Sequence, residues 1–394
     1  MAISKKKKTT DAVTAFFQGF AEADEEISFR FSNEVVYDKL PVINTGSLVL
    51  DDALSCGGVP KGRVVQYYGQ SGSGKTLMAM IAILNAQKED PTAMQLFIDA
   101  EQTYSEEWAS KLGLDPRRVV VVDGEQAVNG RRCFTMLLGE PKEDAKTHVY
   151  KGKKKEGFLD KVTNGEMNFN MVVLDSLGQI IPPGEDVAAV GKMNMALMAR
   201  FLSKELKRLV LEVKKANIPF IIINHKKDNM DPYGVDHTFS GGNTLMHTLS
   251  ANVYFQGSRS KDKILFDEDE NKVGGVIMAT VEKSKFGPWP RKCEFMVDFR
   301  KGVINIEEEV YELAIKYDVI QKTSSITHEF GDDKWKGRSQ TCEALKDEVL
   351  RNKILAKIEE ARDLERETNK AKQEAAFAEL DASSSDVEEE VSEQ

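Results

Sequence analysis

The sequence has little cysteine and no long apolar run. Its four cysteines are widely spaced and include no C-x-x-C pair, which argues against a disulfide framework or a zinc site and favours a reducing compartment. No apolar stretch is long enough to cross a bilayer, so we expect no transmembrane helix. Residues 1–8 are basic, but no apolar stretch of signal-peptide type follows them. Hydrophobic residues still make up 41% of the 394 residues, which predicts one to three globular domains with a sizeable core.

The chain also lacks net positive charge, which at first argues against a nucleic-acid-binding protein. The formal net charge is −10. From Glu379 onward, however, the sequence ELDASSSDVEEEVSEQ holds seven carboxylates and no base, so the remainder carries only −3. Such a run predicts a disordered acidic tail. It could serve solubility, or it could compete with nucleic acid for the protein's own basic surface.

A glycine-rich motif is the strongest signal that is present. Residues 69–76 follow the pattern G-x-x-x-x-G-K-[ST], between an apolar run at 64–68 that predicts a strand and one at 77–84 that predicts a helix. Glycines let backbone N–H groups wrap phosphate oxygens, and the helix start adds unpaired N–H groups and partial positive charge. We therefore expect ATP binding, with Lys75 on the β- and γ-phosphates and Thr76 on Mg²⁺. The predicted loop comprises Gly69, Gln70, Ser71, Gly72, Ser73, Gly74, Lys75 and Thr76.

Two other apolar runs end in acidic residues. Residues 171–175 predict a buried parallel strand with Asp175 at its carboxyl end, where a P-loop enzyme places a carboxylate that helps to hold Mg²⁺. Residues 96–101 predict a second such strand end with Asp99 and Glu101. Glu101 is a candidate general base that would polarise the attacking water. The alternative for Asp99 or Glu101 is a solvated loop charge.

The order of apolar runs predicts an α/β fold. Helical patterns separate most of the strand candidates, which favours a mostly parallel sheet covered on both faces. The strand candidates are residues 64–68, 95–99, 118–122, 171–175, 219–224, 251–255 and 277–281.

Other segments flank or interrupt this predicted core. Residues 10–22 have helical apolar spacing, and so short a helix should pack on its own core or on a neighbouring subunit. Residues 139–165 are lysine-rich, and a solvated surface loop is favoured over a dedicated DNA contact. Residues 304–360 have helical patterns that predict a small C-terminal domain, and residues 361–377 are charged and helix-prone.

The segment before the P-loop resembles that of the bacterial RecA recombinases. It reads PVINTGSL at 41–48, LD at 50–51, AL at 53–54 and GGVPKGR at 57–63. The likeness covers residues 40–360 in the same order, through FIDAE at 97–101, KLGLD at 111–115, LDS at 174–176, IN at 223–224, GGN at 241–243 and KSK at 283–285. The pair Asn224-His225, where bacterial RecA has Asn-Gln, is similar to the UvsX recombinases of tailed phages. The chain therefore resembles a RecA/UvsX-type strand-exchange ATPase of phage type.

The resemblance implies roles for residues near the nucleotide. Glu101 would be the catalytic carboxylate and Asp175 the Walker B acid. His225 would lie where the family senses the γ-phosphate, and its alternative is a hydrogen-bonded strand-end histidine. Trp108 falls near the aromatic residue that the family stacks on adenine, and a plain core tryptophan fits its sequence equally well.

The resemblance also implies DNA contacts and an intersubunit contact. Loops at 182–195 and 226–243 would line a filament axis, where backbone amides and basic side chains hold phosphates and apolar side chains wedge between bases. Lys283 and Lys285 would reach the γ-phosphate of a neighbouring subunit's ATP, as an arginine finger does, and the alternative is a solvated basic edge strand. The implied DNA contacts are Met195, Arg200, Lys226, Lys227, Gly241, Gly242 and Asn243, with an ordinary solvated arginine as the alternative for Arg200.

Three features depart from the bacterial pattern. Met246 and His247 stand where the bacterial protein has a lysine and an aromatic residue that helps to relay the ATP state between subunits. Ser71 stands where the bacterial loop has a glutamate. The insertion at 139–165 has no bacterial counterpart.

The expected fold is thus a RecA-type P-loop ATPase core with a mostly parallel sheet. We expect an N-terminal basic segment and polymerisation helix at 1–38, the core at 39–300, a C-terminal domain at 301–360, and a charged segment with the acidic tail at 361–394. The expected function is ATP- and Mg²⁺-dependent filament assembly on single-stranded DNA, with homologous pairing and strand exchange with double-stranded DNA. A single-strand-binding protein and a loader would assist in the cytoplasm, of a host cell if the chain is phage-encoded, with no membrane partner.

Two other functions remain open on the sequence alone. A hexameric helicase could use the same core, but it usually shows an arginine finger and a separate N-terminal domain, for which the lead-in is too short. A recombinase-like regulatory module is the other alternative, and intact Lys75, Glu101 and Asp175 argue against it.

Overall fold

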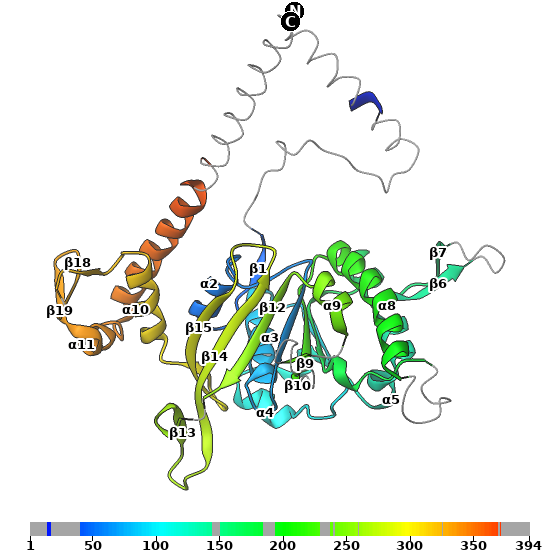
Figure 1. Ribbon diagram of the computed structural model, residues 1–394, viewed down its shortest axis with the longest axis horizontal. Helices are drawn as coiled ribbons and strands as arrows, with labels where there is room; N and C mark the ends of the chain where they lie inside the picture. The colour runs from blue at the N-terminus through cyan, green and yellow to red at the C-terminus, as the bar shows by residue number, and fades with distance from the viewer. Residues whose placement is uncertain are drawn as a thin grey trace, which may run out of the picture. The chain divides into compact units, whose positions relative to one another are not determined.

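The computed structural model describes most of the chain beyond residue 40 (Figure 1). The described residues are 14–16, 40–143, 150–183, 194–228, 237–238, 241–258, 260–324, 326–368 and 371. The chain divides into two compact units, Met1–Leu40 and Pro41–Gln394. In the first unit residues 14–16 are helical, and the rest of the helix predicted at 10–22 lies outside the described residues, as does the predicted acidic tail.

A ten-stranded sheet forms the centre of the second unit, in the order β16-β15-β14-β12-β3-β9-β8-β4-β5 with β13 paired to β14. The six strands from β12 to β5 are parallel, and the remaining pairs are antiparallel. The seven predicted strands are therefore confirmed, as is a mostly parallel sheet. The strands are β3 Val64–Gly69, β4 Met94–Asp99, β5 Val119–Val122, β8 Phe169–Asp175, β9 Phe220–His225, β12 Ala251–Gly257, β13 Ile264–Phe266, β14 Lys272–Ser284, β15 Arg291–Asp298 and β16 Gly302–Ile304.

Helices cover both faces of this sheet, which is why its parallel strands read as continuous apolar runs. Tyr67 packs in the core of one face, whereas Val64 packs in the core of the other, because successive strand residues point to opposite faces. The first face carries α2 Leu48–Ala53, α3 Lys75–Glu89, α4 Glu106–Lys111 and α10 Ile306–Lys316. The second carries α5 Gly124–Val128, α6 Gly130–Leu138, α7 Phe158–Thr163, α8 Asn194–Ala216 and α9 Gly242–Thr248 (Figure 1).

Short elements complete the unit. None of the described helices is long and apolar enough to cross a membrane. The paired short strands are β1 Val42–Ile43 with β2 Val59–Pro60 and β10 Lys227–Asp228 with β11 His237–Thr238. The 3-10 turns are η2 Pro116–Arg118, η3 Leu177–Gln179 and η5 Lys261–Lys263.

The described parts of the lysine-rich insertion form regular structure, whereas its composition predicts a solvated loop. Strand β6 Glu140–Glu143 pairs with β7 Tyr150–Lys155, and α7 follows. Leu159 of α7 is fully buried, and Phe158 lies edge-on against Phe169 with ring centroids 4.8 Å apart. Asp160 accepts a hydrogen bond from the backbone N–H of Gly157 at 2.8 Å, which caps the helix start. The prediction of a solvated loop was therefore wrong for α7, where a few apolar side chains pack despite the basic composition, and residues 144–149 lie outside the described part of the chain.

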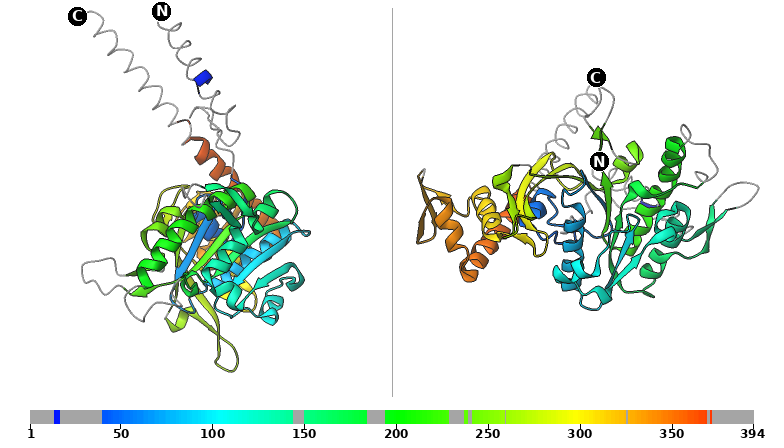
Figure 2. Two further views of the ribbon diagram at one scale, coloured as in Figure 1. Left: turned by 90° about the vertical axis from the view of Figure 1, so that its right-hand side faces the viewer. Right: turned by 90° about the horizontal axis from the view of Figure 1, so that it is seen from below.

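The C-terminal region contains the predicted helices and a small sheet that was not predicted. The helices are α10, α11 Gly337–Ala344 and a helix over residues 348–368, and the strands are β17 Gln321–Lys322, β18 Thr327–Phe330 and β19 Asp333–Lys336. These strands are two to four residues long and largely polar, so they carry no strand signal. The region lies beside α2 and β15, at the opposite end of the main sheet from β5 (Figure 2).

A buried carboxylate of α10, Glu309, attaches that helix to α2, and a second one, Asp51, lies within α2 and holds the segment before it. Glu309 Oε2 accepts hydrogen bonds from the Ser47 hydroxyl at 3.0 Å and from the backbone N–H of Val49 at 3.2 Å, at the start of α2. Asp51 accepts from the backbone N–H of Thr45 at 2.8 Å. Burial raises the pKa of Glu309 to about 7 and that of Asp51 to about 6, although these hydrogen bonds oppose the rise.

Strand β14 contains a β-bulge. Asn252 on β12 faces Lys283, whereas the next residue, Val253, faces Val281, so Glu282 is the extra residue. Regular alternation would turn Lys283 toward the face that holds Val281. The bulge instead puts Lys283 on the face of Asn252, while Ser284 turns to the opposite face.

Candidate active site

The P-loop joins the central strand β3 to helix α3. Gly72 and Gly74 have φ of +70° and +92°, which are left-handed values that favour glycine. A Cβ on Gly74 would lie 2.3 Å from Ile277 Cδ1, so the loop passes close to β14. Gln70, Ser71 and Gly72 are exposed at the tip. The loop is therefore a glycine-shaped cradle before a helix start, as the motif predicts.

Lys75 is buried at the base of this loop. Its ammonium donates to the backbone carbonyls of Gln70 at 2.9 Å and Gly69 at 3.3 Å. Burial lowers the pKa of Lys75, and the carboxylates of Asp175 and Glu101 oppose that shift. The side chain thus lies along the loop, in a site with negative charge on its other side.

Thr76 and Asp175 meet where β8 ends beside the start of α3. The Thr76 hydroxyl donates to Asp175 Oδ2 at 2.7 Å. Asp175 Oδ1 is buried and, within the described part of the chain, has no hydrogen-bond partner. Burial raises the pKa of Asp175 to about 6 despite the Thr76 bond.

An unpartnered carboxylate oxygen beside a hydroxyl fits Mg²⁺, which takes one or two protein oxygens and completes its shell with phosphates and water. Three or more metal-binding side chains do not gather anywhere in the described ranges, so an all-protein metal cage is not seen there.

Glu101, Ser176 and His225 form a compact cluster from three adjacent strand ends. Glu101 Oε1 lies 2.5 Å from His225 Nε2 and accepts from the Ser176 hydroxyl at 2.5 Å. The bond to His225 lowers the pKa of Glu101, against partial burial, and the Ser176 bond adds to the effect. Glu101 is therefore a carboxylate fixed by hydrogen bonds to Ser176 and His225 rather than a solvated loop charge. Its neighbour Asp99 accepts the backbone N–H groups of the following turn instead.

Trp108 makes the contacts of a core tryptophan with the residues that the structure describes. It lies on α4 and packs against the core cluster of the α3 face. Its indole N–H donates to the backbone carbonyl of Phe299 at 2.6 Å. Stacking on adenine stays a prediction.

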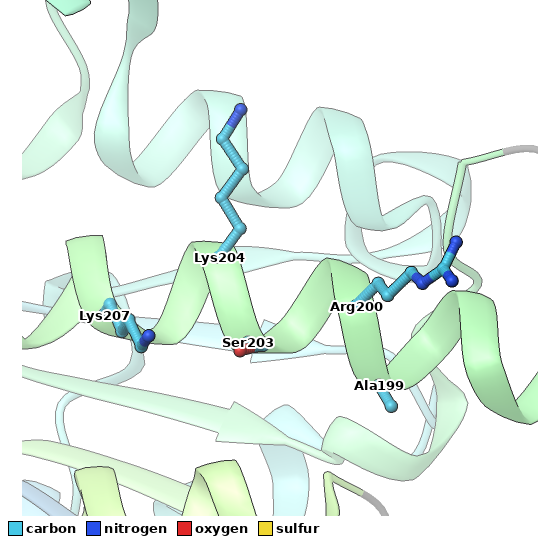
Figure 3. A pocket seen from close by; sticks show the side chains of 5 residues that line it. All are labelled: Ala199, Arg200, Ser203, Lys204 and Lys207. Atoms are coloured by element: carbon cyan, nitrogen blue, oxygen red, sulfur yellow. The ribbon is translucent and has the colours of Figure 1, made fainter.

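The predicted DNA contacts fall on α8, α9 and the strand that follows β9. Arg200, Lys204 and Lys207 project from the outer face of α8 and line an open hollow of about 600 Å³ with Ala199 and Ser203 (Figure 3). Lys226 lies with its ammonium 5.9 Å from the ring centroid of Tyr254. Met195 lies in the first turn of α8, Lys227 in β10, Gly241 at the N-cap of α9, and Gly242 and Asn243 in its first turn. The side chains of Met195, Lys227 and Asn243, and most of both predicted loops, lie outside the described residues.

Lys283 and Lys285 are two residues apart and so share a face of the sheet, and the bulge makes this the face of Asn252. The Lys283 ammonium donates to the backbone carbonyl of Met246 in α9. Burial lowers the pKa of Lys283, and the charge of Lys285 lowers it further. Both lysines therefore stand near α9, and their predicted contact with a second subunit stays a prediction.

Sequence reasoning missed Ser176 and a set of polar residues inside the strands, Gln66, Asn252 and Glu282. The signal for Gln66 and Asn252 was a lone amide in an otherwise apolar run, since a buried polar side chain needs a partner.

Comparison with known proteins places these features in a family. The family model for the RecA N-terminal domain matches residues 26–136 and 151–304. The unmatched stretch, residues 137–150, contains β6, so the prediction that the whole insertion at 139–165 lacks a bacterial counterpart was wrong for residues 151–165. The chain is 31% identical to Protein RecA of Chloroherpeton thalassium over 325 residues, which are 82% of this chain and 81% of the relative. It is 30% identical to Protein RecA of Helicobacter pylori strain G27 over 330 residues, 82% and 84% of the two chains. The α/β core, the P-loop and its acidic strand ends are thus those of a chain that belongs to the RecA family.

Proposed function

We propose that this chain is a DNA-dependent ATPase that forms helical filaments on single-stranded DNA and catalyses homologous pairing and strand exchange. The observation that carries the proposal is the meeting of P-loop, Thr76–Asp175 pair and Glu101–His225 pair at adjacent strand ends in a chain of this family. The pair Asn224-His225 supports a phage-type recombinase within the family.

In this mechanism the chain's own residues bind and orient the triphosphate. The loop N–H groups and Lys75 would hold the β- and γ-phosphates, with Lys75 leaving the carbonyls of Gly69 and Gln70. Thr76 and Asp175 would hold Mg²⁺, which supplies charge neutralisation between the phosphates when bound. The unpartnered Asp175 oxygen supports this assignment.

Glu101 would orient the attacking water as general base. Its lowered pKa keeps it ionised, and Ser176 and His225 fix its carboxylate. A γ-phosphate near His225 would compete with Glu101 for the imidazole. His225 would then report the nucleotide state to the second DNA loop, which begins directly after it.

DNA would bind along α8 and the two loops, largely without sequence preference. Arg200 and the lysines of α8 offer phosphate contacts, and Lys226 lies at the start of the second loop. We further propose the division into segments 1–38, 39–300, 301–360 and 361–394, with a single-strand-binding protein and a loader as partners.

Electron microscopy with single-stranded DNA and a non-hydrolysable ATP analogue tests the proposal, together with an ATPase assay with and without DNA. We expect helical filaments and DNA-stimulated hydrolysis, and Lys75→Ala should lose both because it loses nucleotide binding. Closed rings would favour a helicase. No assembly and no hydrolysis would favour a regulatory module.

A further inference from the structure

A row of polar side chains crosses four strands of the central sheet at the level of the candidate active site. It runs from Asn224 on β9 through Gln66 on β3 and Asn252 on β12 to Glu282 on β14. Asn224 Nδ2 donates to Gln66 Oε1 at 3.2 Å, Gln66 Nε2 to Asn252 Oδ1 at 2.8 Å, and Asn252 Nδ2 to Glu282 Oε2 at 3.3 Å. The three amide side chains are fully buried, where a broken hydrogen bond is costly.

In every hydrogen bond of this row the donor lies on the His225 side and the acceptor on the Glu282 side. At one end the backbone N–H of His225 donates to Asn224 Oδ1 at 3.0 Å. At the other end the Glu282 carboxylate accepts from Asn252 and also from the Tyr68 hydroxyl. A peptide N–H only donates and a carboxylate only accepts, so turning over one amide would set like groups against each other on both of its sides. The two ends therefore lock the amides into one shared orientation.

The ends of the row lie where the proposed function puts nucleotide. Asn224 directly precedes His225, the residue bonded to the candidate catalytic carboxylate. Glu282 is the extra residue of the bulge that turns both Lys283 and Lys285 to the face of Asn252. Lys283 in turn bonds to the backbone of α9, which follows the second predicted DNA loop and lies over this face of the sheet (Figure 1).

We propose that Asn252 and Glu282 are positioning residues. They couple the orientation of Lys283 and Lys285 to the end of β9 at which the proposed function places the nucleotide. A shift of Asn224 when nucleotide binds would then act on a hydrogen-bonded row, in which each amide constrains the next, rather than on apolar side chains that can slide. The nucleotide state of one subunit and the lysines that face the next subunit would respond together. The inference rests on the proposed function, since it assigns the lysines to a neighbour's nucleotide.

A charge swap along the row tests this proposal. Asn252→Asp keeps the side-chain size and can still accept from Gln66, but it sets a carboxylate against Glu282. In the double variant Asn252→Asp/Glu282→Gln, the new amide can donate to the new carboxylate and still accept from Tyr68. Every bond of the row can then form again, with the charge moved by one strand. Glu294→Gln on β15 is the matched control, because this carboxylate pairs with Lys263 away from the row.

Three readouts separate positioning from general damage. They are nucleotide affinity of the DNA-free protein, kcat and KM of DNA-stimulated ATP hydrolysis, and filament length with a non-hydrolysable analogue. We expect Asn252→Asp to keep nucleotide affinity and KM while kcat falls about tenfold and filaments shorten, a size typical of coupling between sites. The double variant should recover most of the loss, and the control should match the wild type.

A wild-type kcat in Asn252→Asp would overturn the inference, as would a folded double variant that is no better than the single one. If circular dichroism shows that Asn252→Asp does not fold, the Glu282→Ala variant tests the proposal instead. Glu282 lies at the half-buried end of the row, and the substitution leaves the number of residues in β14 unchanged. It should show the same selective loss, and a wild-type profile would refute the idea. A wild-type protein without filaments and without DNA-stimulated hydrolysis would instead overturn the proposed function, and this inference with it.

Discussion

The carboxylate of Glu309 should make the stability of this fold fall as the pH rises toward neutrality. It is buried between α10 and α2, and its pKa is raised from 4.5 to about 7, first by burial and further by the nearby charge of Asp51. Well below pH 4.5 it is protonated in both the folded and the unfolded chain. As the pH rises from 4.5 to the folded pKa of about 7, the unfolded chain loses this proton while the folded chain still holds it, so the free energy of unfolding falls. The shift corresponds to a fall of roughly 3 kcal/mol at about 1.4 kcal/mol per unit.

Glu309→Gln should remove this part of the pH dependence. The amide can still accept from Ser47 and Val49, and any offset from the changed group is the same at every pH. Urea unfolding followed by far-UV circular dichroism, without nucleotide, should show the wild type losing roughly 3 kcal/mol more than the variant between about pH 4 and pH 8. Glu343→Gln, on the exposed side of α11, should leave the wild-type slope intact. Parallel curves for wild type and Glu309→Gln would refute the reasoning.

Three further substitutions test the site. Glu101→Gln should keep nucleotide binding but slow ATP hydrolysis by about 100-fold or more, as expected for a lost general base, and hydrolysis at the wild-type rate would remove Glu101 from the mechanism. Lys283→Ala should lower DNA-stimulated hydrolysis and ATP-dependent filament growth together; losing one without the other would show that the lysine does not couple them. Gly74→Ala should weaken nucleotide binding, because a Cβ would lie 2.3 Å from Ile277 Cδ1 on a backbone of left-handed φ, and an unchanged dissociation constant by fluorescence titration would contradict this.

The strands of the main sheet could be predicted because strands buried on both faces read as continuous apolar runs. Phe220–His225 is an example, with five of its six residues buried. The short strand Asp333–Lys336 could not, since its largely exposed polar side chains give no alternation. Helix α7 was hidden for a related reason: Leu159 is its one fully buried side chain in a lysine-rich stretch.

The candidate site, like the fold, could be predicted from the sequence only in part. The P-loop is a local motif, so its residues could be numbered before the fold was known. The bond between Ser176 and Glu101 joins positions 75 apart, and the bond between Gln66 and Asn252 joins positions 186 apart. Such contacts depend on which strands become neighbours and in what register, and a single sequence does not specify either. A lone polar residue in a buried strand shows only that some partner must exist.

The bulge in β14 makes residue count, rather than residue type, decide which face the two lysines occupy. Deleting Ser284 would join Lys285 directly to Lys283 and turn Lys285 toward the face that holds Val281. Deleting Glu282 would leave both lysines on their present face, although it would remove the end of the buried row. The facing of the two lysines should therefore survive shortening at position 282 and not two residues later. An alignment of this strand with related chains should allow a gap at position 282, because a gap placed elsewhere would match lysines that point in opposite directions.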